Sequence, residues 1–148
     1  MTRLVAIDPG HHKCGLVLID KPRALVEEGL VLSVHNVMDQ MHAWSCSGGV
    51  DLILLGNGTS SDAWDGLLER VAPVQTVNER GTTLRARGRY WQLWPPKGLQ
   101  RLIPQGMRIP PGDLDAVAAL VMAEEHLGQT FRWPPPPPPP DFRSALAR

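Results

Sequence analysis

A short apolar run that ends in an Asp-Pro-Gly turn places the strongest constraint on how this chain folds. The run Leu4–Ile7 is rich in β-branched residues, which predicts a strand, and Asp8-Pro9-Gly10 predicts a tight turn after it. A second apolar run over residues 16–19 then predicts a hairpin. Because a buried strand holds the side chain at its end rigidly, Asp8 is a candidate for ligand binding or catalysis. The alternative is that Asp8 only caps the turn.

Periodicity along the rest of the chain predicts an α/β fold. Further strands are expected over residues 24–34, 50–56 and 73–79, and helices over residues 37–46, 63–71, 84–93 and 115–127. Residues 97–112 are rich in proline and glycine and are expected to form an irregular loop. With the first, fourth and fifth strands parallel, these elements predict a mixed five-stranded sheet flanked by helices.

The 148 residues fit one domain, which we place at residues 1–130, followed by a proline-rich tail over residues 131–148 that contains seven consecutive prolines. No apolar run approaches the roughly 20 residues of a membrane span, and the N-terminus lacks a signal-peptide pattern. We therefore expect a cytoplasmic protein without a membrane partner. Two widely spaced cysteines, Cys14 and Cys46, indicate neither a disulfide framework nor a zinc site, and both are expected to be buried.

The net charge is zero, but the charges are unevenly distributed. Residues 80–112 contain seven Lys or Arg residues and no Asp or Glu, so this segment carries +7 and the remainder −7. Such a block favours a polyanion as partner, because a solvated basic surface normally carries interspersed acids. Tyr90, Trp91 and Trp94 lie within it and are candidates either for base stacking or for helix packing.

Four carboxylates fall where a shared site could form. Asp8 and Glu79 end predicted strands, and Asp113 and Asp115 lie at the start of the last helix, where one of them could instead be a cap. Carboxylates brought together repel one another unless a cation lies between them, and oxygen ligands select Mg²⁺ or Mn²⁺. Two such ions about 4 Å apart can activate water and stabilise the leaving oxygen of a phosphodiester. The acids and the basic block together predict a metal-dependent nuclease.

A series of motifs in the chain resembles the successive motifs of the YqgF family. They are Ile7-Asp8-Pro9-Gly10 with Lys13 and Gly15, the strand at residues 52–56, Asn78-Glu79-Arg80-Gly81-Thr82-Thr83, and Asp115-Ala116-Val117-Ala118-Ala119. That family belongs to the ribonuclease H-like superfamily with the RuvC resolvases. The resemblance implies a ribonuclease H-like fold and metal-dependent cleavage of a nucleic-acid backbone. Family members are linked to ribosome biogenesis through processing of the 5′ end of pre-16S ribosomal RNA, and are also labelled as candidate Holliday junction resolvases.

The resemblance also assigns roles to individual residues. Asp8, Glu79 and Asp115 match the family's acids, whereas the further acid of the resolvase pattern would lie at Gly112 rather than at Asp113. Polar positions around the acids are matched by Lys13, Arg80, Thr82 and Thr83.

We therefore expect a nuclease that acts in pre-16S ribosomal RNA processing, with RNA favoured over DNA as the substrate. The expected metal ligands are Asp8, Glu79, Asp115 and Asp113, and the expected substrate-binding residues are Lys13, Arg80, Thr82, Thr83, Arg85 and Arg89. Two alternatives stay open: a DNA endonuclease like the Holliday junction resolvases, and a nucleic-acid-binding adaptor without turnover. A resolvase would need a two-fold dimer, whereas we expect a monomer or a weak homodimer.

Overall fold

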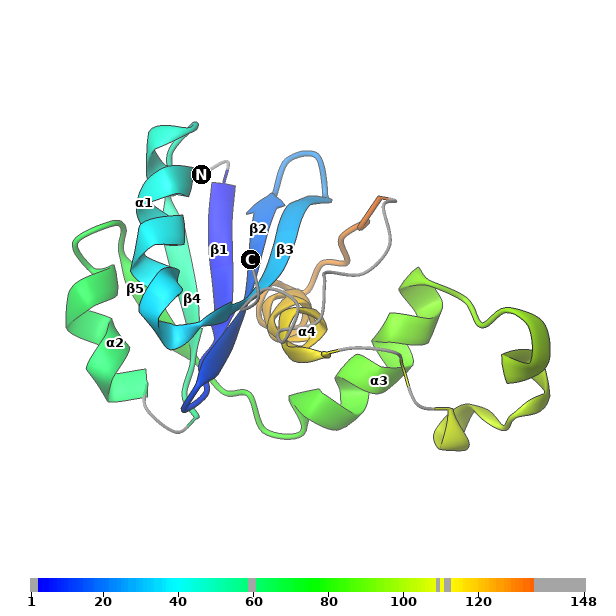
Figure 1. Cartoon of the computed structure of the whole chain (residues 1–148). Coiled ribbons are helices and arrows are strands. Elements are labelled where there is room, and N and C mark those ends of the chain that lie inside the picture. Colours follow the sequence, from blue (N-terminus) through cyan, green and yellow to red (C-terminus); the bar gives the residue numbers. More distant parts are fainter. Residues whose placement is uncertain (1–2, 59–60, 109, 111–112, 135–148) are drawn as a thin grey trace.

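A mixed five-stranded sheet lies at the centre of the computed structural model, which describes residues 3–58, 61–108, 110 and 113–134 (Figure 1). The strands are β1 (Arg3–Asp8), β2 (Lys13–Asp20), β3 (Leu25–Ser33), β4 (Leu52–Gly56) and β5 (Val74–Val77). Their order across the sheet is β3-β2-β1-β4-β5, with β1, β4 and β5 parallel and β2 antiparallel to both of its neighbours. The predicted fold class is confirmed, and this sheet is compatible with a ribonuclease H-like fold.

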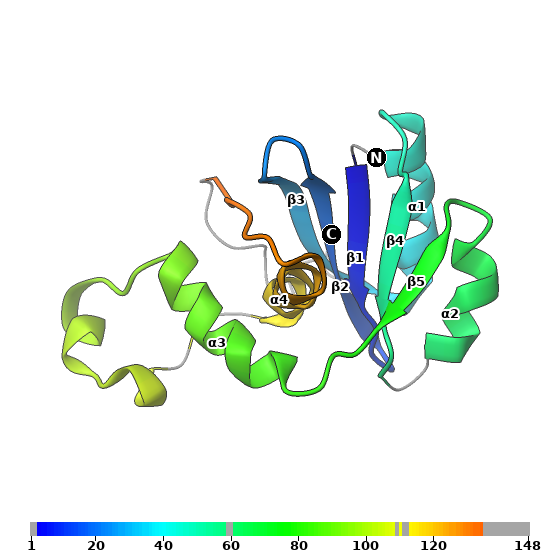
Figure 2. The same ribbon diagram turned by 180° about the vertical axis from the view of Figure 1, so that it is seen from behind.

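Helices cover both faces of the sheet and form a further layer on one side. They are α1 (Val37–Cys46), α2 (Ser61–Leu68), α3 (Thr82–Leu93) and α4 (Asp115–Leu127). Figures 1 and 2 show α1 and α2 on one face and α4 on the other, with α3 packed outside α4. Three 3-10 turns complete the described elements: Val34–Asn36, Gly98–Leu102 and Gln105–Met107.

The small residues of α4 allow it to pack closely against the sheet, as its sequence predicts. Residues 116–124 of this helix are all buried, because the sheet covers one side of the helix and α3 covers another. At Gly15 of β2 the two main chains meet, and a Cβ there would clash with the backbone carbonyl of Asp115. Gly15 is also the register partner of Asp8 in β1, so this contact places the start of α4 beside the end of β1.

Several predicted boundaries differ from those of the structure. The strand β5 ends at Val77, so Glu79 lies two residues beyond it, and α3 begins two residues before the predicted helix. Cys14 is buried as predicted, but Cys46 is exposed at the end of α1. In the described part of the chain, no helix has the length and apolar character that crossing a bilayer requires.

The chain stays on the fold beyond the predicted tail boundary at residue 131. Phe131 is a core residue, and Arg132 forms a bridge with Leu25 beside β3, where the Val26 N–H donates to the Arg132 carbonyl at 2.7 Å. The Trp133 ring packs edge-on against Trp94 with a centroid separation of 5.0 Å. Apolar burial therefore keeps residues 131–133 on the fold, ahead of the proline run. Most of the proline run lies outside the described residues.

The contact at Gly15 predicts a specific sensitivity to substitution. Gly15→Ala forces a methyl group onto the main chain of α4, so we expect it to lower the free energy of unfolding by about 1–3 kcal/mol. Urea unfolding monitored by circular dichroism measures this. Gly66→Ala is the control, because a Cβ at this position in α2 meets no atom within 4 Å. We expect the control to be neutral or slightly stabilising, and equal losses in both variants would contradict the close approach at Gly15.

Candidate acidic active site

Three of the four predicted carboxylates interact at one edge of the sheet. Asp8 is the last residue of β1, and Asp115 is the first residue of α4. Glu79 lies two residues after the end of β5. The charges of Glu79 and Asp115 both act on the Asp8 carboxyl, and Asp8 is within hydrogen-bonding reach of Glu79. The sheet topology explains this convergence, because the carboxyl ends of parallel strands share one edge.

Burial and mutual repulsion together change the acidity of Asp8. Desolvation contributes most, followed by the hydrogen bond with Glu79 and by the negative charges of Glu79 and Asp115, and together they raise the pKa of Asp8 from 3.8 to about 8. Glu79 Oε2 is buried, and no nitrogen or hydroxyl donor among the described residues reaches it. Without a cation, this site therefore retains a proton on Asp8 at neutral pH.

Gly56, Asn57 and Gly58, at the end of β4 and just after it, fix the position of Glu79. A Cβ at Gly56 or at Gly58 would overlap the Glu79 carboxylate, so both positions leave space for it. The Asn57 Oδ1 accepts a hydrogen bond from the Glu79 N–H at 3.3 Å. The positioning role of Gly56-Asn57-Gly58 was not predicted from the sequence, although glycines that flank a polar residue at a strand end are a recognisable signal.

The turn into α3 holds Glu79 from the other side. Gly81 has a φ of 74°, a left-handed conformation that glycine adopts readily, and it leads directly into Thr82. The Thr82 hydroxyl donates to the Glu79 carbonyl at 2.8 Å and is buried, so Thr82 positions the main chain and does not face solvent. Arg80 and Thr83 are exposed, as substrate-binding residues need to be.

Lys13 links the site to the chain before α4. Its ammonium lies 2.5 Å from Asp113 Oδ1 and 3.2 Å from Asp115 Oδ2. Burial lowers the pKa of Lys13, but the hydrogen bond to Asp113 and the charge of Asp115 outweigh that effect and raise it, so Lys13 is cationic. Asp113 thus stands beside the three acids as a partner of Lys13.

The donor chemistry fits a hard divalent cation, but a closed metal site is not preformed. Carboxylate oxygens are the ligands that Mg²⁺ and Mn²⁺ prefer, and Glu79 Oε2 has no hydrogen-bond donor in the part of the chain that the structure describes. Within the described residues, however, no group of three or more His, Cys, Asp or Glu side chains already encloses a metal-sized position. The Lys13 ammonium is the cation that contacts Asp115 in this arrangement.

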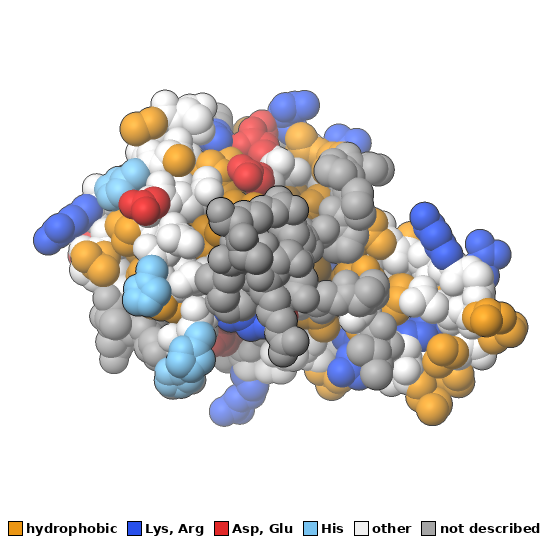
Figure 3. All heavy atoms as spheres, viewed as in Figure 1, with side chains coloured by type: hydrophobic (Ala, Val, Ile, Leu, Met, Phe, Trp, Pro, Cys, Tyr) orange, Lys and Arg blue, Asp and Glu red, His pale blue; other side chains and the backbone are white. Residues whose placement is uncertain are grey.

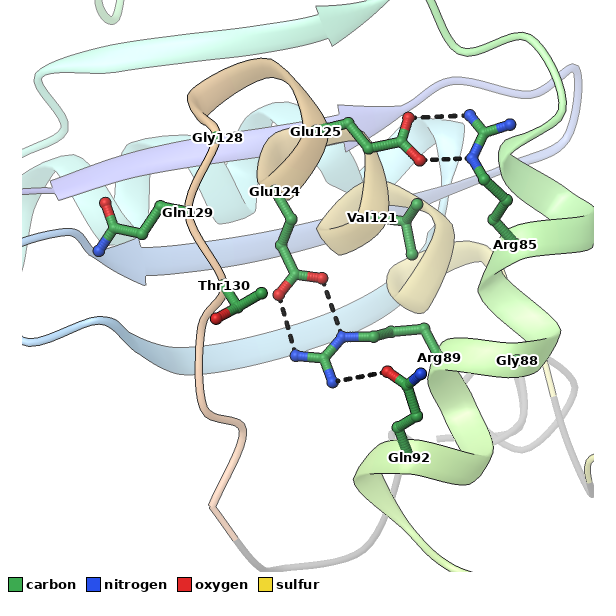
Figure 4. Close-up of a pocket in the computed structure, with 10 residues that line it drawn as sticks. All are labelled: Arg85, Gly88, Arg89, Gln92, Val121, Glu124, Glu125, Gly128, Gln129 and Thr130. Atoms are coloured by element: carbon green, nitrogen blue, oxygen red, sulfur yellow. Dashed lines mark hydrogen bonds and ion pairs between the residues drawn. The ribbon is translucent and has the colours of Figure 1, made fainter.

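Arg85 and Arg89 bind carboxylates of the same chain. Figure 4 shows Arg85 paired with Glu125 and Arg89 paired with Glu124, along a groove of about 610 Å³ between α3 and α4. Both pairs are bidentate, and Arg89 also donates to the Phe131 carbonyl at 2.9 Å. These two guanidinium groups therefore hold α3 on α4, which accounts for part of the basic block without a nucleic acid.

Comparisons with known proteins do not identify the chain. No family model matches it, and no curated protein shows significant similarity to it.

The raised pKa of Asp8 predicts how stability changes with pH. Between about pH 4 and pH 8 the folded protein keeps a proton that the unfolded chain releases, so the free energy of unfolding falls as the pH rises. The fall is at most about 1.4 kcal/mol per pH unit for one proton. Urea unfolding in EDTA across this range measures the slope. Asp8→Asn should flatten it and should stabilise the protein near pH 8, and an unchanged slope would show that Asp8 is not the group responsible.

Proposed function

We propose that this protein is a divalent-metal-dependent nuclease that hydrolyses the phosphodiester backbone of nucleic acid. The observation that carries the proposal is the convergence of Asp8, Glu79 and Asp115 at the carboxyl ends of the parallel strands, where burial, the hydrogen bond with Glu79 and the neighbouring negative charges raise the pKa of Asp8 to about 8. A fold gains no stability from crowding three acids, so the arrangement calls for a positively charged ligand. The family resemblance of the same residues supports RNA as the substrate, in processing of pre-16S ribosomal RNA.

In this proposal Asp8, Glu79 and Asp115 would hold Mg²⁺ or Mn²⁺. One or two such ions, when bound, would supply an activated water and neutralise charge on the leaving oxygen. Asp8 must release its proton to become a ligand, so metal affinity should increase with pH up to about 8. To bind the metal, the Asp115 carboxylate would have to leave its ion pair with Lys13.

Two cations flank the acids and can bind the scissile phosphate. The Lys13 ammonium, which lies 2.5 Å from Asp113 Oδ1 in this structure, would contact a phosphate oxygen if Asp115 served as a metal ligand. Arg80 follows Glu79 directly, is exposed, and forms no ion pair with any described residue. These residues would orient the phosphodiester over the acids, whereas Arg85 and Arg89 maintain the helix packing.

A cleavage assay tests this function directly. Wild type, Asp8→Asn and the control Asp39→Asn, an exposed acid in α1, are incubated with single-stranded RNA, single-stranded DNA and a four-way DNA junction in Mg²⁺, Mn²⁺ or EDTA. We expect metal-dependent cleavage of RNA by wild type and by the control, and a loss of more than about 100-fold in Asp8→Asn. Preferred cleavage of the junction would favour a resolvase, and binding without cleavage in any metal would favour an adaptor.

The glycines beside Glu79 give a second test of the metal site. In Gly58→Ala the new methyl group displaces the Glu79 carboxylate, which is the mobile end of a side chain, so we expect little loss of stability. Metal affinity should fall about 10- to 100-fold, as is usual when support for a ligand is removed. A titration with Mn²⁺ followed by thermal unfolding measures both quantities, with Gly66→Ala as the control. Wild-type affinity in Gly58→Ala would exclude Glu79 as a ligand.

A further inference from the structure

The segment that connects α3 to α4 protrudes from the rest of the molecule. Residues 97–108, which we call the arm, contain two 3-10 turns and lie at the far end of the molecule beyond α3 (Figure 1). Leu99 and Leu102 are each 80 % exposed and Met107 is 71 % exposed. Figure 3 shows hydrophobic side chains beside Lys and Arg side chains at this end. Aliphatic side chains grouped on a protruding segment indicate an interaction surface.

The cations of the arm have two different roles. The Arg108 guanidinium donates to the carbonyls of Gln100 at 3.0 Å and Ile103 at 2.8 Å, so it holds the arm in its folded shape. Lys97 and Arg101 are exposed, and neither forms an ion pair with a described residue. Since no acid occurs between residues 80 and 112, the arm presents unneutralised positive charge next to apolar surface. A nucleic-acid strand offers the complement, because it combines phosphates with the apolar faces of bases.

A cleft separates the arm from α3 and has the dimensions of a site for one ring system. It is lined by Trp91, Gln100, Ile103, Met107 and Arg108 and has a volume of about 210 Å³, below the roughly 300 Å³ at which sites for drug-sized ligands begin. Trp91 is only 7 % exposed, and its indole N–H has no acceptor among the described residues. The buried N–H is thus out of reach of the cleft, and what Trp91 offers to a ligand there is the apolar surface of its ring, which suits a flat aromatic partner.

We propose that the cleft between α3 and the arm binds one unpaired base of a nucleic-acid strand. The Trp91 ring and the aliphatic side chains pack against the base, and Lys97 and Arg101 contact the neighbouring phosphates. This inference rests on the proposed function for its class of partner, and it deepens that function by naming the substrate class. The protein then selects nucleic acids with unpaired bases over uninterrupted duplexes.

Binding in EDTA tests the cleft without any need for cleavage. Fluorescence anisotropy compares a labelled single-stranded RNA with a fully paired RNA duplex of the same length, for wild type, Trp91→Phe and Trp94→Phe. Trp94 is the matched control, because its indole N–H is also buried without an acceptor among the residues that the structure describes, but it does not line the cleft. Because phenylalanine offers a smaller ring surface, we expect Trp91→Phe to weaken single-strand binding about three- to tenfold, and Trp94→Phe to change it less than about twofold.

Two further variants keep the test decisive if Trp91→Phe disturbs folding. Met107→Ser alters an exposed side chain that lines the cleft, and it should weaken single-strand binding without affecting stability. The double variant Lys97→Ala with Arg101→Ala should reduce the slope of log affinity against log salt by about 1.4, which corresponds to two lost single-strand phosphate contacts.

Equal affinities for wild type, Trp91→Phe and Met107→Ser would overturn the proposal, as would equal binding of duplex and single strand. Failure to bind either RNA would overturn it too and would favour an acidic protein as the partner of the arm. These results are separable from the nuclease assay. If RNA binding depends on Trp91 but no metal supports cleavage, the base-binding cleft is retained and the nuclease proposal is rejected. If the protein cleaves RNA but its binding does not depend on Trp91, the nuclease proposal is retained and the base-binding cleft is rejected.

Discussion

The start of α4 lies against β2 because Gly15 has no side chain, and much of the structure depends on that contact. The contact sets the distance between α4 and the sheet. It thereby places Asp115, the first residue of the helix, beside Asp8, which is the register partner of Gly15. The position of α3 follows, because this helix packs on α4. The arm continues from the end of α3. One absent methyl group thus determines both the geometry of the acids and the placement of the basic surface.

Charge in this protein is balanced through space rather than along the chain. The basic block contains no acids, but α4 supplies Glu124 and Glu125 to two of its arginines, and main-chain carbonyls accept the hydrogen bonds of Arg108. Among the described residues, the cations of the block that pair with no carboxylate are Arg80, Arg87, Lys97, Arg101 and Arg108, and all except Arg108 are exposed. The acids accumulate at the sheet edge instead, where Lys13 offsets only part of their charge. A polyanion that bridges the two regions would require a cation at the acids, which is consistent with a metal-dependent enzyme.

The sequence is sufficient to predict the strands, their mixed order and the convergence of Asp8, Glu79 and Asp115, because each acid follows an apolar run or opens a helix. It is not sufficient for features that depend on tertiary contacts. Arg85 and Arg89 read as free cations until α4 is placed beside them, and Thr82 reads as a surface hydroxyl until its bond to the Glu79 carbonyl is seen. Asn57 likewise gains its role only when β4 and β5 are paired.

Residues 131–133 run beside the start of β3 and affect how two copies of this protein can associate. A strand at the margin of a sheet presents unpaired amides and carbonyls that invite another strand. At the start of β3, the main chain of Arg132 occupies that margin through two hydrogen bonds, and the Glu124 carboxylate holds the Phe131 N–H in place. Trp133 then packs over Gly29, where any larger residue would push it away. Residues 131–133 thus block the addition of another strand at the start of β3. A truncation that removed them would expose the β3 main chain there and favour self-association.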